Sequence, residues 1–153
     1  MNEVDLTHGG FYKQFASKEA LFTEAARQAF ADLEALLAAL DSRHGGDRAA
    51  ARSDLVGYYL SAEHRDDASA GCPTTGLSSD LARSANASAA KSTYAEGVES
   101  FARWLGGEDA DQEASDEAIR SMCALVGALV VARAASGTAL SDRVLGAARA
   151  GTA

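Results

Sequence analysis

Apolar residues recur at intervals of three and four along this chain, and that spacing constrains its fold more than any other feature. The clearest stripe follows Ser17, which can cap a helix, and continues to about Ser42. Residues spaced in this way share one face of an α-helix. Alanine, the best intrinsic helix former, supplies 35 of the 153 residues, and the only proline is Pro73. The sequence therefore predicts an all-α fold. The stripe consists of Leu21, Phe22, Ala25, Ala29, Phe30, Leu33, Leu37 and Leu40.

The same reading places six or seven helices along the chain and no strand. Asp47 can cap the next helix, whose inward residues are Leu55, Val56, Tyr59 and Leu60. Pro73 suits the first turn of a helix because it lacks an N–H group that would be unpaired there. Further helices are expected over residues 73–85, 88–105, 115–135 and 138–150, with polar connections at 65–71 and 106–111.

The formal net charge of −8 restricts the partners of the chain. It makes uniform attraction to nucleic acid or to an anionic membrane unfavourable, so any contact with DNA needs a local patch. The first thirty residues are close to neutral and are the part of the chain that phosphate repels least. The longest apolar run, residues 122–132, is about half the ~20 residues of a membrane-spanning helix. We therefore expect no membrane partner. Two distant cysteines that match no zinc or redox pattern indicate a reduced cytoplasm as the setting.

The residue types that usually carry catalysis are scattered. His8, His44 and His64 fall in different segments without metal-ligand spacing, and we expect His64 at the surface. Cys72 and Cys123 match no zinc or redox pattern, and no nucleophile elbow or phosphate-binding loop is present. The sequence predicts no enzyme, no metal site and no cofactor.

One string near the start carries a more specific signal. Residues 6–22 read LTHGGFYKQFASKEALF, with Tyr12 and Phe15 followed by Ser17, Lys18 and Glu19. This string resembles the recognition helix and the following junction of the tetracycline-repressor (TetR) family of bacterial transcriptional regulators. The resemblance implies a partial helix-turn-helix DNA-binding domain over residues 1–17, with its recognition helix near 7–15, and a helical ligand-binding and dimerisation domain over 18–153.

By the same resemblance, the first helix and most of the second helix of the DNA-binding unit are missing. We expect an N-terminally truncated regulator whose affinity for operator DNA is weak or absent until those helices are supplied. A recognition helix reads base edges in the major groove while its neighbours contact phosphates. The residues placed at DNA are Thr7, His8, Gly9, Gly10, Tyr12, Lys13 and Lys18.

The remainder of the chain would bind an effector and a second copy. The helices over 115–135 and 138–150 would form a four-helix dimer interface, although a central core helix of a monomer is the alternative for the first of them. The predicted interface residues are Ile119, Met122, Val126, Leu129, Val130, Leu140 and Val144. An effector pocket is mostly apolar and aromatic with a few polar groups. Its candidate residues are Tyr59, Cys72, Tyr94, Phe101 and Trp104.

These expectations combine into one function and one alternative. The first is a TetR-type regulator, expected to be a repressor and a homodimer, whose small-molecule effector changes the separation of two recognition helices. The alternative is a DNA-independent helical module that dimerises or binds a small molecule.

Overall fold

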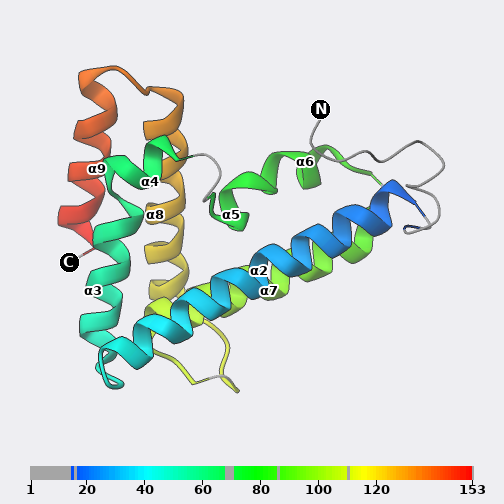
Figure 1. Ribbon diagram of the computed structural model, residues 1–153, viewed down its shortest axis with the longest axis horizontal. Helices are drawn as coiled ribbons and strands as arrows, with labels where there is room; N and C mark the ends of the chain where they lie inside the picture. The colour runs from blue at the N-terminus through cyan, green and yellow to red at the C-terminus, as the bar shows by residue number, and fades with distance from the viewer. Residues whose placement is uncertain (1–14, 16, 68–70, 86, 110, 153) are drawn as a thin grey trace.

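The computed structural model describes residues 15, 17–67, 71–85, 87–109 and 111–152. Within these ranges the chain is all-helical, which confirms the predicted fold class at that level. The helices are α2 (Lys18–Arg43), α3 (Arg48–Tyr59), α4 (Ala62–Asp66), α5 (Pro73–Gly76), α6 (Ser78–Arg83), α7 (Ser88–Gly106), α8 (Asp116–Ala134) and α9 (Ala139–Gly151) (Figure 1).

Three of the predicted helix starts are confirmed by their capping contacts. The side chains of Ser17, Asp47 and Ser115 each accept a hydrogen bond of 3.0–3.2 Å from the backbone N–H three residues further on. Such a bond satisfies one of the unpaired donors in the first turn of a helix. At the other end of α7, Gly107 has a φ of 77°, the left-handed conformation that commonly terminates a helix.

The two long helices α2 and α7 lie side by side and run in the same direction (Figure 1). Ser100 donates a hydrogen bond of 3.2 Å to Glu34, and Trp104 donates one of 3.0 Å to Asp41. Between these helices, a Cβ atom added to Gly97 would overlap the ring of Phe30. Glycine at this position therefore allows α2 and α7 to approach closely.

At one end of this pair, α3, α4, α8 and α9 form an upright block (Figure 1). The main core lies where the block meets the pair. Its most deeply buried side chains come from α3, α7 and α8, with Leu60 following α3: Leu55, Leu60, Phe101, Leu105, Leu125 and Leu129. Among the described residues, no helix combines the length and the apolar character that crossing a bilayer requires.

Two local predictions are wrong. The connection expected at 65–71 begins inside α4, and His64, expected at the surface, is 3% exposed. The helix expected over residues 73–85 is divided at Leu77 into α5 and α6. Gly76, a poor helix former, ends α5, and the Ser78 hydroxyl bonds the Thr75 carbonyl at 3.0 Å.

Candidate functional site

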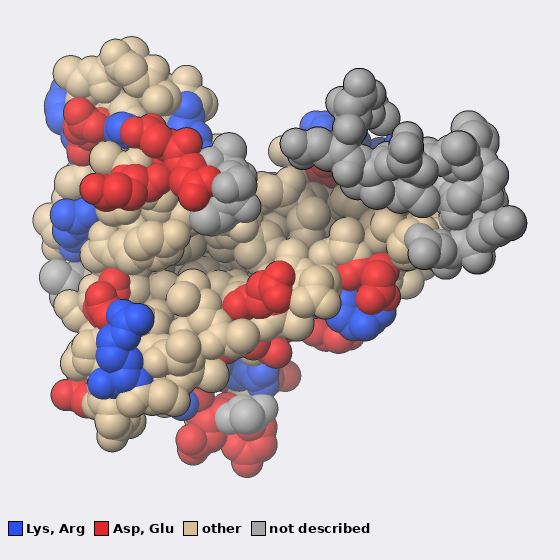
Figure 2. All heavy atoms as spheres, viewed as in Figure 1, with Lys and Arg blue, Asp and Glu red and all other residues tan. Residues whose placement is uncertain are grey.

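A cavity of about 370 Å³ lies between α2, α3, α4 and the segment that leads into α5. Its volume is within the usual range of small-molecule sites, ~300–1,000 Å³. Figure 2 shows largely uncharged surface between α4 and α2, with carboxylates gathered over α4, where Asp66 and Asp67 are exposed. The wall residues are Ala29, Asp32, Leu33 and Leu36 of α2, Leu55, Tyr58 and Tyr59 of α3, His64 of α4, and Gly71, Cys72 and Pro73.

His64 is the most constrained polar residue of this wall. Its Nδ1 lies 2.8 Å from the carbonyl oxygen of Tyr59. Because a carbonyl oxygen can only accept, Nδ1 carries the proton, and Nε2 of the neutral ring is an acceptor. The His64 ring stacks on Tyr58 with a centroid distance of 5.0 Å and meets Tyr59 edge-on at 4.8 Å. The three rings thus form one aromatic wall.

The hydroxyl of Tyr59 is buried beside this wall. Tyr59 is 3% exposed, and its hydroxyl is buried from solvent beside the Cys72 thiol and the Thr75 hydroxyl. Burial raises the pKa of Tyr59, and the neighbouring Cys72 thiol raises it further, so the group keeps its proton.

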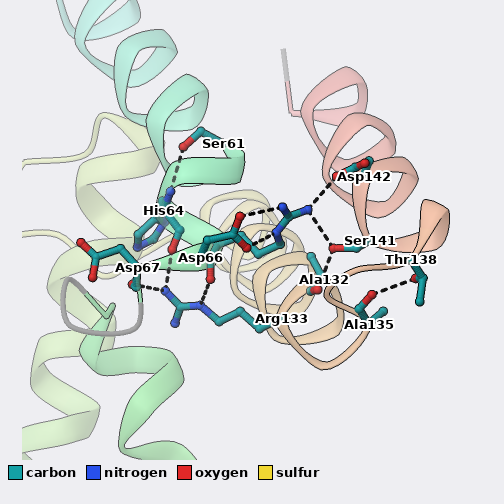
Figure 3. Close-up of polar contacts among 11 residues, drawn as sticks. Ser61, His64, Asp66, Asp67, Ala132, Arg133, Ala135, Thr138, Ser141 and Asp142 are labelled. Atoms are coloured by element: carbon teal, nitrogen blue, oxygen red, sulfur yellow. Dashed lines mark hydrogen bonds and ion pairs between the residues drawn. The ribbon is translucent and has the colours of Figure 1, made fainter.

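The short helix α4 is held by side chains from outside it (Figure 3). Ser61 caps its start by accepting from the backbone N–H of His64 at 3.1 Å. At its end, the guanidinium of Arg133 on α8 donates to three carbonyl oxygens, those of His64 at 2.8 Å and of Arg65 and Asp67 at 3.2 Å. The last carbonyls of α4, which have no partner inside the helix, are satisfied in this way.

Arg65 continues these contacts from α4 to α9. Its side chain, 11% exposed, donates to Asp142 at 2.6 Å and to the Ser141 hydroxyl at 3.0 Å, and it binds both oxygens of Asp66 at 2.7 and 2.8 Å. The hydrogen bond from Arg65 lowers the pKa of Asp66. Ser141 is fully buried and donates to the Ala132 carbonyl at 2.7 Å. The element that carries His64 is therefore joined to both α8 and α9 (Figure 3).

The structure brings together only part of the predicted pocket. Tyr59 and Cys72 line the cavity, whereas Tyr94, Phe101 and Trp104 do not. These three lie on α7, and the Phe101 ring packs on that of Tyr59 within the core, with a centroid distance of 6.2 Å. Tyr94 donates to the Thr74 carbonyl at 2.8 Å, Phe101 is 1% exposed in the core, and Trp104 bonds Asp41. The wall residues missed from the sequence include Leu33, Leu36 and His64. The only local indication in the sequence that His64 belongs to an aromatic wall is the pair Tyr58–Tyr59, which ends five residues before it.

The predicted interface residues divide into two groups. Met122 and Leu129 are 5% and 0% exposed within the core of their own chain, so they cannot contact a second copy. The prediction failed for these two because α8 is apolar on two sides and one side packs on α3, α7 and α9. Val126 and Val144 are half-buried. The exposed members are Ile119 (38%), Val130 (43%) and Leu140 (51%). Val131, which follows Val130 and was not predicted, is also exposed (47%).

The predicted DNA contacts lie almost entirely outside the described residues. Those outside are Thr7, His8, Gly9, Gly10, Tyr12 and Lys13. Lys18 is the first residue of α2 and is exposed. Within the described ranges, no group of three or more His, Cys, Asp or Glu side chains could hold a metal ion.

Comparison with known proteins gives no family for the chain. No family model matches it, and no curated protein matches it either. The TetR resemblance of residues 6–22 therefore stays a prediction made from the sequence.

Proposed function

We propose that the chain is a TetR-type transcriptional regulator, a repressor, whose affinity for DNA depends on a small molecule bound in the cavity. One observation carries this proposal. The helix α2 begins within the string that resembles a recognition-helix junction and continues without a break to the cavity wall. Lys18 is at its first position, and Asp32, Leu33 and Leu36 line the cavity further along.

Because α2 is continuous, a movement at the cavity wall would also displace its N-terminal end. With a rise of 1.5 Å per residue, Lys18 lies about 22 Å along the axis from Leu33. A pivot of about 10° at the cavity would therefore move Lys18 by about 4 Å. Two recognition helices must match half-sites about 34–36 Å apart, so a shift of that size is enough to weaken binding. The ligand has to bind the two orientations of α2 with different affinities for this to occur.

The exposed apolar side of α8 supports a dimer in this proposal. We define the α8 face as Ile119, Val126, Val130 and Val131, and we include Leu140, an exposed apolar residue of α9; all but the half-buried Val126 are exposed. Ala124 and Gly127, also exposed, are small residues that permit close approach of a second helix. Exposed apolar side chains rimmed by polar residues mark candidate sites of protein association. A two-fold pairing of this face with its copy would set the distance between the two α2 helices.

Selection of DNA from a random pool tests the proposal. The protein for this experiment is the longest in-frame product of the gene, immobilised and incubated with random duplexes. We expect enrichment of two related half-sites in inverted orientation, with centres about 10 base pairs or a multiple apart. If no duplex is enriched while the protein is folded and dimeric, the chain is a DNA-independent helical module instead.

A further inference from the structure

We infer that the cavity binds an uncharged planar aromatic compound with a hydroxyl group, a phenol or naphthol, which donates its proton to Nε2 of His64. The inference rests on the proposed function in taking the cavity as the effector site. It adds the chemical class of the effector, which follows from the charge, the shape and the hydrogen-bonding groups of the wall.

The charge of the wall excludes anionic ligands. The described residues that line the cavity include no lysine or arginine. They do include one acidic residue, Asp32. An anion would have to lose its hydration without gaining a positive partner, close to a like charge. Asp32 is exposed and accepts from Gln28 at 2.8 Å, so it lies toward solvent rather than among the buried polar groups.

The shape of the wall favours a flat ring. Leu33 and Leu36 come from α2 on one side, and the rings of Tyr58, Tyr59 and His64 come from α3 and α4. Aromatic rings prefer offset stacked or edge-to-face partners. A planar ligand can stack on this wall while its other face contacts leucine side chains. The volume of about 370 Å³ has room for a fused two-ring compound.

The hydrogen-bonding groups of the wall specify a hydroxyl. Nε2 of His64 needs a donor, because Nδ1 already donates to the Tyr59 carbonyl and no described residue bonds Nε2. A phenolic hydroxyl can donate to this nitrogen. An ether can only accept, and a carboxylate cannot donate.

Calorimetric titration of the purified chain, without DNA, tests this assignment. The probes are β-naphthol, its methyl ether, β-naphthoate and β-naphthylmethylammonium. We expect β-naphthol to bind about five- to tenfold more tightly than the ether, the value of one neutral hydrogen bond, and β-naphthoate not to bind. Equal affinity for naphthol and ether, tighter binding of the naphthoate or of the ammonium compound, or no binding of any probe would each overturn the inference.

Two variants test whether the probes bind in this cavity and whether His64 makes the hydrogen bond. His64→Asn keeps a side-chain donor for the Tyr59 carbonyl but removes Nε2, so naphthol and ether should bind it equally. Leu36→Trp fills the cavity from a position that is 41% exposed, and it should abolish binding of both probes without altering His64. Unchanged naphthol binding by both variants would place the ligand elsewhere and overturn the inference. DNA selection without enrichment would refute the proposed function and leave these titrations interpretable.

Discussion

Arg133 of α8 donates a hydrogen bond of 2.8 Å to the carbonyl oxygen of His64, the residue of α4 that lines the cavity. The same guanidinium reaches the carbonyls of Arg65 and Asp67, so a single side chain positions the end of α4. The position of the cavity wall thus depends on α8, the helix that also carries the exposed apolar face.

Replacing Arg133 should therefore destabilise the chain. Arg133→Met removes the donors of three carbonyl groups and should lower the free energy of unfolding by about 2–3 kcal/mol, because hydrogen bonds from charged groups contribute about 1.5–3 kcal/mol. Arg133→Lys keeps the charge without the planar fork and should recover only part of the loss. Urea unfolding measures both variants. Faster hydrogen exchange of the α4 amides should accompany the loss, and a change below about 0.5 kcal/mol for Arg133→Met would contradict this role.

Gly97 tests the packing of α2 on α7. A Cβ at this position would overlap the ring of Phe30, so Gly97→Ala should cost about 1–3 kcal/mol, the usual penalty of overpacking a core. Gly57→Ala is the matched control, since a Cβ there has no neighbour within 4 Å. In that helix the substitution should be neutral or stabilising by up to about 1 kcal/mol. Thermal unfolding of the two variants gives the comparison, and equal effects would refute the close approach.

The ion pair of Arg65 and Asp66 should appear in the acid stability of the chain. Arg65 lowers the pKa of the Asp66 carboxyl from its ordinary value of 3.8. The pair therefore adds stability above pH 3.8, and this contribution is lost as the pH falls through the lower folded-state pKa. Between about pH 7 and about pH 2, Asp66→Asn should lose less stability than the wild type. A loss for Asp66→Asn that is as steep as that of the wild type, or steeper, would contradict the assignment.

The α8 face predicts the oligomeric state. Sedimentation at micromolar concentration should show a dimer for the wild type and a monomer for Val130→Asp, because a charge on an apolar interface is costly to bury. Ala95→Glu adds a charge to an exposed position of α7 and should leave the dimer intact. If the wild type is a monomer, or if Val130→Asp forms a dimer as stable as that of the wild type, the α8 face is not a dimer interface.

The sequence predicts the elements that local chemistry determines. Ser17, Asp47 and Ser115 mark helix starts because each cap is made within three residues. α4 was missed because a helix of five residues is too short to be stable alone, and its partners Arg133 and Asp142 lie more than sixty residues away.

The candidate site was harder to predict for the same reason. Periodicity identifies apolar residues but does not say which of two apolar sides of α8 faces its own core, so Met122 and Leu129 were placed in an interface. The aromatic residues of α7 are no different in sequence from those of the cavity. Phe101 packs on the ring of Tyr59 within the core, and Trp104 packs against that core, so neither lines the cavity that Tyr59 lines.

α2 begins at Lys18 and continues to the cavity wall, and the contribution of Lys18 to DNA affinity tests whether this helix links DNA binding to the cavity. The measurement is fluorescence anisotropy of the selected duplex over a range of salt concentrations, with the longest in-frame product of the gene. Lys18→Ala should weaken binding to all duplexes and reduce the slope of log affinity against log salt by about one, whereas Lys91→Ala on α7 should change neither. Binding that is unaffected by Lys18→Ala, or equally affected by Lys91→Ala, would show that the start of α2 does not contact DNA.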